Sequence, residues 1–431
     1  MSIDKTSAIP QDETAVENPE AAAAAVTAVD PRLLVREQGL AGYLGEFRRK
    51  MKAGELGSLP VVIGLIVICI VFQSLNSNFL SAQNLSDITV TMVGTGMISV
   101  GIVFVLLLGE IDLSVGSVSG AASALAAVLA VNQGWPEWLA VLTAIAAGLV
   151  IGAAHGFFFA VLGAPAFAVT LAGLLFWLGF MLKVLGENGT INLDGDGLIG
   201  KLTTYFFSDV AAAYGLALVV VAVFFITSFL SNRRREAAGI PSRPLSDTLV
   251  RTVLLAVASF AAAYMYNQYK GLPLATVIFL AFLIGTDFLL RRTAYGRKIF
   301  ALGGSVEASR RAGINVTAVR ISVFAISGGF AAIGGLFLAS KIASANQSAG
   351  TGDLLMNAIA AAVIGGTSLF GGRGRTWNAL LGVLVIVSIQ YGLQLESIAE
   401  PVKYMITAAV LLTTVVIDSI TRKTQKTAGR A

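Results

Sequence analysis

The chain has 431 residues, of which 56% are hydrophobic and only 13% charged, and its mean hydropathy is +0.79. A soluble domain carries about 25% charged residues, so this composition excludes a soluble globular protein and indicates an all-α polytopic membrane protein. A single cysteine, Cys69, and a single histidine, His155, exclude a disulfide framework, a multi-cysteine metal site and a His-pair zinc site. The net charge of +5 does not indicate nucleic-acid binding, because the basic residues cluster in short loops beside apolar runs.

Residues 1–57 are polar, with an alanine run at 21–25, and they lack the basic start, apolar core and cleavage site of a signal peptide. We expect a largely disordered extension. Four basic residues stand just before the first apolar run, namely Arg48, Arg49, Lys50 and Lys52. This charge predicts a cytoplasmic N-terminus.

From there to residue 420 the chain contains about twelve apolar runs that are long enough to cross a bilayer. The predicted spans are 58–76, 86–108, 114–132, 137–160, 165–183, 210–231, 250–267, 272–290, 320–340, 353–370, 376–394 and 402–419. Because crossings alternate in direction, a cytoplasmic start places nearly all basic clusters in cytoplasmic loops, among them Arg233–Arg235, Arg291–Arg292, Arg297–Lys298, Arg310–Arg311, Arg373 and Arg375, and the tail 421–431. The acidic loop 184–204 falls outside. Charge and hydropathy therefore agree on a multi-pass plasma-membrane protein with both termini in the cytoplasm.

The segment Gly109-Glu110-Ile111-Asp112-Leu113-Ser114-Val115-Gly116 joins the second and third predicted spans. A carboxylate in lipid costs about 2.5–3.5 kcal/mol unless it reaches water or a partner, so Glu110 and Asp112 indicate a functional helix break. We expect Asp112 to accept hydrogen bonds from backbone N–H groups left free at this break. The same two residues could instead be the titrating pair of a proton- or sodium-coupled secondary transporter.

A related segment, Gly365-Gly366-Thr367-Ser368-Leu369-Phe370-Gly371-Gly372, lies near the C-terminus, and both segments fit Gly-x-x-x-Leu-x-x-Gly. Each follows a helix, a polar connector and a second helix, and each precedes a third helix. The second connector runs from Ser340 to Gly352. Both units enter from the predicted cytoplasmic side, so we predict a parallel internal repeat. A chance likeness between two glycine-rich turns is the alternative.

Glycines recur every fourth residue in two predicted spans, at Gly148, Gly152 and Gly156 and at Gly116 and Gly120. Small residues at this spacing predict close helix packing in lipid. His155, next to Gly156, is interpreted as a packing histidine with satisfied hydrogen bonds rather than a substrate contact.

The run Gly195 to Lys201 fits the start of a phosphate-binding loop, but Leu202 stands where a hydroxyl residue should hold magnesium. We also expect no strand before it. The match is therefore interpreted as spurious, and ATP and Mg²⁺ are expected on a separate chain, with no cofactor on this one.

The largest internal cytoplasmic loop, 291–319, contains a predicted short helix over Glu307 to Ile314. Ser305 can cap its start, Glu307 sits in the positive first turn, and Gly313 can end it. Glu307 and Arg311 are spaced as an i,i+4 ion pair. An exposed helix between two spans is suited to docking a partner. The alternative is a solvated loop helix.

Together these motifs resemble the membrane subunits of bacterial ABC importers for monosaccharides of the ribose, arabinose, galactose and xylose group. The resemblance covers about residues 55–420, with the extra spans and basic linker around 233–251 most similar to the xylose permeases. It is carried by Gly109 to Gly116, Ala358 to Leu369, Glu307-Ala308-Ser309 with Gly313, Gly303-Gly304, and Pro165-x-Phe167-x-Val169-Thr170-Leu171. Three positions depart from the common pattern: Asn357 stands where the family commonly has Asp, Ser309 where it has Ala, and Glu110 where it has a second glycine.

The resemblance implies a coupling helix seated on a cytoplasmic ATPase subunit, formed by Glu307, Ala308, Ser309, Arg310, Arg311 and Gly313. It also implies a second permease copy around a central path and a sugar-binding protein that delivers substrate. The expected translocation region comprises Gly109, Glu110, Asp112, Gly116, Gly365, Gly366, Thr367, Ser368, Gly371 and Gly372. Because a sugar is neutral, hydroxyls, amides and aromatic faces should line its path. Possible contacts are Thr170, Trp177, Asn357 and Gln390.

Overall fold

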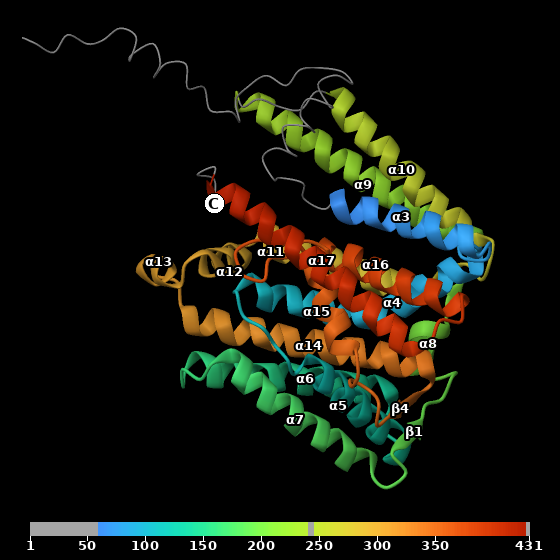
Figure 1. Ribbon diagram of the computed structural model, residues 1–431, viewed down its shortest axis with the longest axis vertical. Helices are drawn as coiled ribbons and strands as arrows, with labels where there is room; N and C mark the ends of the chain where they lie inside the picture. The colour runs from blue at the N-terminus through green and yellow to red at the C-terminus, as the bar shows by residue number, and fades with distance from the viewer. Residues whose placement is uncertain (1–58, 240–244, 428–431) are drawn as a thin grey trace, which may run out of the picture.

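The computed structural model describes residues 59–239 and 245–427, so the predicted extension 1–57 and the last residues of the tail lie outside the described ranges. The described chain is a bundle of helices lying roughly along one direction, with two very short β-ladders (Figure 1). Within the described residues nine helices are long and apolar enough to cross a membrane. The predicted all-α polytopic fold is confirmed.

All twelve predicted spans coincide with helices. Their bounds are α3 Leu59–Leu75, α4 Ala82–Leu107, α5 Val115–Ala127 with a π-helical turn at Val128–Asn132, α6 Glu137–Ala160, α7 Ala166–Leu185, α9 Val210–Ala237, α10 Leu245–Asn267, α11 Leu274–Arg292, α14 Val316–Ile342, α15 Leu354–Ile364, α16 Thr376–Leu395 and α17 Glu400–Thr427. Three short helices complete the described set, namely α8 Leu198–Thr204, α12 Ala294–Gly304 and α13 Val306–Arg311. The prediction of one helix in the loop 291–319 missed α12.

The spanning helices alternate in direction and define two ends of the bundle. Helices α12 and α13 lie at one end, and α8, β1 and β4 lie at the opposite end (Figure 1). We call these the α13 end and the α8 end. Strand β1 (Thr190–Asn192) pairs antiparallel with β4 (Ser344–Asn346), and β2 (Phe206–Phe207) pairs with β3 (Leu272–Pro273).

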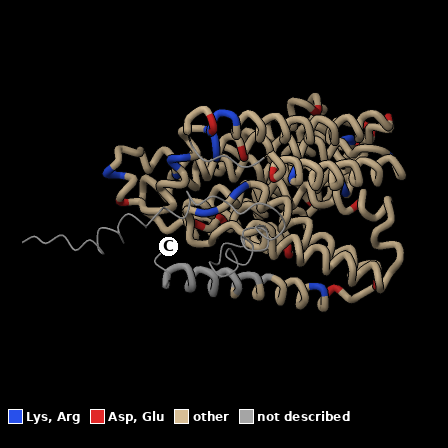
Figure 2. The backbone as a smooth tube through the Cα atoms, turned by 90° about the horizontal axis from the view of Figure 1, so that it is seen from above, with Lys and Arg blue, Asp and Glu red and all other residues tan. Residues whose placement is uncertain are grey.

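Arginine is confined to the α13 end among the side chains that the structure describes. The arginines flank helix ends or lie in α12 and α13 there, whereas the basic residues at the α8 end are Lys183, Lys201, Lys270, Lys341 and Lys403. Figure 2 shows more of the basic positions toward the α13 end. The distribution follows the predicted charge asymmetry.

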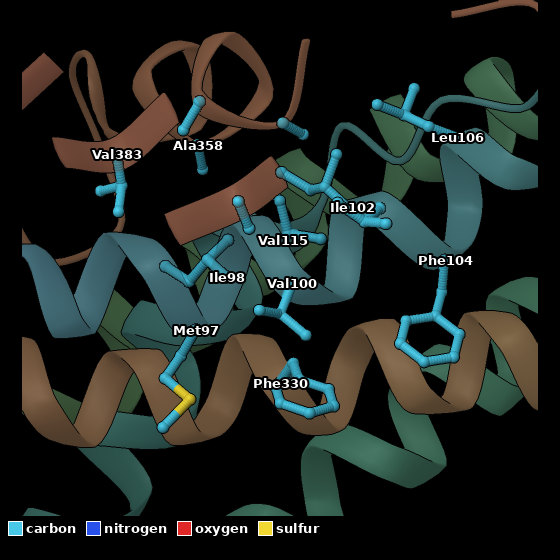
Figure 3. Close-up of a cluster of buried hydrophobic side chains, with 14 of the residues drawn as sticks. Met97, Ile98, Val100, Ile102, Phe104, Leu106, Val115, Phe330, Ala358 and Val383 are labelled. Carbon is cyan, nitrogen blue, oxygen red and sulfur yellow. The ribbon is translucent and has the colours of Figure 1, made fainter. Parts of the chain in front are cut away.

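Helix α4 forms the centre of the bundle, because 89% of its apolar window is buried inside the protein. Met97, Ile98 and Phe104 are fully buried. Figure 3 shows side chains of α4 between Phe330 of α14 on one side and Ala358 and Val383, from α15 and α16, on the other. By contrast α9 and α10 are only 11% buried and pack mainly against each other, so they form a lipid-facing hairpin at the periphery.

The predicted span 353–370 is shorter in the structure. Helix α15 has 11 residues, which at 1.5 Å per residue reaches about half of a bilayer core of about 30 Å. It ends because Gly366 adopts φ +103°, and residues 365–375 continue without regular structure. The units α3–α4–α5 and α14–α15–α16 both begin at the α13 end, so the repeat runs in parallel as predicted, with α15 much shorter than α4.

The expectation that no strand precedes the phosphate-loop-like run was wrong, because β1 stands directly before Leu193. The run nevertheless does not form an open anion site. The Oε2 atom of Glu137 accepts a hydrogen bond from the Ile199 backbone N–H at 2.8 Å, so a carboxylate already occupies the start of α8.

Candidate translocation and coupling site

Helix α13 is a short exposed helix at one end of the bundle. The Ser305 Oγ accepts a hydrogen bond from Ala308 N at 3.2 Å, Arg311 Nε lies 3.2 Å from Glu307 Oε1, and Gly313 adopts φ +77°. The cap, the ion pair and the terminal glycine are therefore as predicted. Within α13, Ser309 is buried and Val306 is half-buried against the hydrophobic core, so these two side chains face the bundle. The side chains of Glu307, Ala308, Arg310 and Arg311 are exposed.

Helix α12 connects α13 to two helix breaks. The first break lies between α4 and α5, and the second lies between α15 and α16. The last turn of α12 contains Gly303, and a Cβ atom at this position would lie 1.8 Å from Leu107 O and 2.7 Å from Gly372 N. Gly372 N itself donates a hydrogen bond to Leu107 O at 2.9 Å. Main chains of α12, the end of α4 and the segment after α15 are thus in direct contact, and the two related segments found in the sequence meet here.

Glycine is required at this meeting point by both space and backbone conformation. Gly109, Gly371 and Gly372 adopt φ values of +80°, +86° and +72°, which L side chains rarely tolerate. A Cβ on Gly371 would lie 2.8 Å from Gly303 O and 3.0 Å from Gly109 N. We call Gly109, Gly303, Gly371 and Gly372 the glycine junction. Because backbone meets backbone, a displacement of α12 reaches both breaks without a flexible side chain in between.

A buried polar chain starts three residues beyond Gly109. Asp112 is 3% exposed, and its Oδ1 accepts hydrogen bonds from Ser114 N at 3.0 Å and Ser114 Oγ at 2.6 Å. Its Oδ2 accepts a hydrogen bond from Ser327 Oγ on α14 at 3.1 Å. Asp112 therefore caps a free backbone N–H at the break, as expected, and also ties the break to α14.

The chain continues through His155 on α6 to Trp177 on α7. Trp177 Nε1 donates to His155 Nε2 at 3.2 Å, and His155 Nδ1 lies 3.2 Å from Ser114 Oγ. Because an indole N–H can only donate, Nε2 is the acceptor, and the proton of the neutral imidazole is on Nδ1, from which it is donated toward Ser114. We call Asp112, Ser114, His155, Trp177 and Ser327 the polar chain. All its donors point toward one carboxylate, and its members link α6, α7 and α14 to the break before α5.

The chain is similar to known transport permeases over most of its length. A family model described as the permease component of the branched-chain amino acid transport system matches residues 84–415. The chain belongs to this family of transport permeases. The permease is 33% identical over 374 residues to the xylose transport system permease protein of Escherichia coli K12, covering 86% of this chain and 94% of the relative.

Two further relatives are also sugar permeases. The xylose transport system permease protein of Haemophilus influenzae is 33% identical over 375 residues, covering 87% of this chain and 99% of the relative. The ribose import permease protein of Bacillus subtilis is 29% identical over 365 residues, covering 85% of this chain and 94% of the relative. No solved structure matches the chain. The resemblance to monosaccharide permeases stated from the motifs is confirmed.

In the permease, Glu110 and Asp112 have different surroundings. Glu110 is half-buried toward the α13 end, where burial raises the pKa of its carboxyl group and the Arg320 guanidinium opposes that rise. Asp112 is held by hydroxyl and backbone donors of the polar chain. The two carboxyl groups therefore differ both in exposure and in the groups that bind them.

The predicted small-residue seam lies between α6 and α14 of the permease. A Cβ on Gly148 would lie 2.5 Å from Gly328 O, and one on Gly152 would lie 2.1 Å from Phe324 O. Gly116 and Gly120 also mark a close approach, to the carbonyls of residues 350 and 349 in the connector after β4, and a Cβ on Gly120 would in addition lie 2.6 Å from Met181 Sδ on α7. Packing is the role of these glycines.

Of the possible substrate contacts, Trp177 belongs to the polar chain. Thr170 is fully buried, and its Oγ1 donates to Ala166 O on its own helix at 3.0 Å. Asn357 on α15 donates from Nδ2 to Asp353 Oδ2 at 2.6 Å, and Gln390 is half-buried on α16. The four predicted residues thus lie on three helices, α7, α15 and α16, and the polar groups of Thr170 and Asn357 are already hydrogen-bonded within their own helices or caps.

The hydroxyl groups of Thr367 and Ser368, in the break after α15, also form hydrogen bonds with nearby residues. Thr367 Oγ1 accepts from Asn378 Nδ2 at 3.2 Å, and Ser368 Oγ accepts from Phe370 N at 3.1 Å. Gly365 approaches α16, since a Cβ there would lie 1.8 Å from Asn378 O. These residues fix the shape of the segment that carries Gly371 and Gly372.

Two site residues were not found from the sequence. Ser327 is one hydroxyl within a long apolar run, with no motif around it. Gly303 entered only as part of the family resemblance, and nothing local distinguishes it from Gly304. Both owe their roles to segments more than 180 residues away in sequence, as the contacts with residues 107 and 112 show.

Proposed function

We propose that this permease is the membrane-spanning subunit of an ATP-driven importer that passes a monosaccharide from a sugar-binding protein into the cytoplasm. The monosaccharide that we propose is D-xylose. The observation that carries the proposal is the continuous main-chain connection from exposed α13 through Gly303 to both helix breaks. The names of the xylose and ribose relatives supply the sugar class.

In this proposal α13 is the coupling helix and sits on a cytoplasmic ATPase subunit that carries ATP and Mg²⁺. The outward-facing residues Glu307, Ala308, Arg310 and Arg311 supply the contact, while buried Ser309 holds α13 to the bundle. ATP can drive transport only if the ATPase binds one arrangement of the permease more tightly than the other. The glycine junction converts that preference into a change at the breaks.

The arginine-rich α13 end is the cytoplasmic end in this proposal. Basic residues near helix ends remain on the cytoplasmic side during insertion, and arginine is found only at this end among the described side chains. A second copy of the permease completes the central path. The sugar-binding protein then docks at the α8 end.

The experiment is uptake of labelled D-xylose and D-ribose by cells that lack this permease and regain it together with its genomic neighbours. Xylose uptake that requires a separate ATPase chain supports the proposal. Uptake that collapses with an uncoupler while ATP stays high would instead establish the ion-coupled alternative based on Glu110 and Asp112.

Matched variants test the coupling helix itself. Ala308→Glu and Ala308→Trp should abolish ATPase binding and uptake, because they place charge or bulk on the exposed docking face. Ala238→Glu changes another exposed alanine at the end of α9 and should leave both unchanged. Normal ATPase binding by both α13 variants would refute the assignment.

A further inference from the structure

A second feature at the α13 end is a surface pocket of about 390 Å³ beside the last turn of α11. It is lined by Leu290, Arg291, Arg297, Phe300, Gly374 and Arg375. These residues come from the end of α11, from α12 and from the segment just before α16. None of them belongs to α13 or to the polar chain, so the function proposed above leaves the pocket without a role.

The pocket concentrates positive charge. Arg291 Nη1 lies 3.6 Å from Asp287 Oδ2, which offsets one of the three guanidinium charges. In the parts of the chain that the structure describes, Arg297 and Arg375 have no carboxylate within 4.0 Å. Two uncompensated guanidinium groups that face one pocket favour an anion, and their planar donor forks match the oxygens of a phosphate.

An exposed apolar stripe leads along α11 to the same pocket. Ile284 and Phe288 are 54% and 62% exposed, and Arg291 follows on the same face at i+7 from Ile284. Helix α11 is one of the helices that can span a membrane. Acyl chains can therefore cover Ile284 and Phe288 while a head group bonded to the same molecule reaches Arg291.

We propose that this pocket binds the head group of an anionic phospholipid whose acyl chains lie along α11. Basic pockets between helices at the cytoplasmic membrane boundary suit such head groups. A free phosphate would not use the apolar stripe, and an acidic protein surface would not use Leu290, Phe300 and the adjoining lipid-facing helix. The lipid would also hold α12, which carries both Arg297 and Gly303 of the glycine junction.

The test is binding of phosphatidylglycerol to the purified full-length permease, measured by native mass spectrometry and by competition against a fluorescent phosphatidylglycerol. Each basic residue near the surface contributes about fivefold to such binding, so Arg297→Gln with Arg375→Gln should weaken it about 25-fold. Binding of phosphatidylcholine should not change. Arg297→Lys keeps the charge but loses the donor fork, and should give a smaller loss.

The matched control is Arg310→Gln with Arg311→Gln, which removes the same charge from α13 at the same end. This control should retain phosphatidylglycerol binding. If both double variants lost phosphatidylglycerol binding equally, the binding would reflect only the general attraction of an anionic lipid to a basic surface, and the proposal would be overturned. Full displacement of the lipid by millimolar inorganic phosphate would reveal a free-anion site, and loss of ATPase binding with lipid binding intact would reveal a protein contact. Either result would also overturn it.

Discussion

The sharpest perturbation of the glycine junction is Gly303→Ala. The added Cβ would lie 1.8 Å from Leu107 O, whereas ordinary contacts begin at 3.4 Å, so α12 and the end of α4 must separate by the difference, about 1.6 Å. The other close atom, Gly372 N, is also backbone. No side-chain rotation can therefore relieve the clash, and the variant pushes α12 away from both breaks.

The energetic consequence can be bounded. Overpacking of this kind costs about 1–3 kcal/mol, while replacing a helical glycine by alanine returns about 0.8–1.0 kcal/mol of helix propensity. The net loss of stability for Gly303→Ala is thus at most about 2 kcal/mol. Gly304→Ala gains the same propensity, and its Cβ meets no atom within 4 Å, so it should be neutral or slightly stabilising.

The assay compares sugar uptake, ATPase binding and thermal stability of the two neighbouring variants. If backbone contact transmits the movement, Gly303→Ala should lower uptake at least tenfold, equivalent to about 1.4 kcal/mol, while ATPase binding at α13 persists. Gly304→Ala should transport normally. Uptake by Gly303→Ala equal to that of Gly304→Ala would refute the transmission argument.

Four further outcomes are expected. Ser327→Ala should destabilise the permease by about 1–3 kcal/mol in denaturation experiments, because it removes a donor from a buried carboxylate. Gly152→Ala should lower the melting temperature, since its Cβ would lie 2.1 Å from an α14 carbonyl, whereas Gly285→Ala, with nothing within 4 Å, should not. Burial raises the pKa of Glu110 above its ordinary 4.5, so the stability it confers is present at low pH and is lost as pH rises through the raised pKa. Glu110→Gln should accordingly remove that decline in melting temperature. A cysteine at Arg310 should resist impermeant reagents added outside intact cells, and labelling there would reverse the proposed orientation.

What the sequence predicts well in this permease depends on local signals. The cap, ion pair and terminal glycine of α13 lie within nine residues of one another, so helix-end rules are sufficient. The break at Asp112 was predictable because a carboxylate between two apolar runs needs partners. Spans were predictable from hydropathy, except that the apolar Leu369 and Phe370 after Gly365-Gly366 concealed the early end of α15.

What the sequence does not predict depends on contacts between distant segments. Helix α12 is not predicted from the sequence, and it is the burial of Ile299 and Leu302 against the bundle that holds it in place. Similarly, the two glycine-rich segments were recognised as related, but their contact requires Gly303 to approach both main chains. Such approaches are set by the packing of α4 and α14–α16, and a single sequence carries no local signal for them.

The junction and the polar chain act on opposite ends of the same short segment, since Gly109 and Asp112 are three residues apart. Asp112 receives three hydrogen bonds, and bonds to a charged group contribute about 1.5–3 kcal/mol each. Reversing a two-state equilibrium from 1:99 to 99:1 needs about 5.5 kcal/mol. Breaking all three bonds would cost at least about 4.5 kcal/mol, most of what the proposed coupling needs to shift the helices. If that coupling operates, we therefore expect the segment to turn at the junction while Asp112 keeps most of its donors.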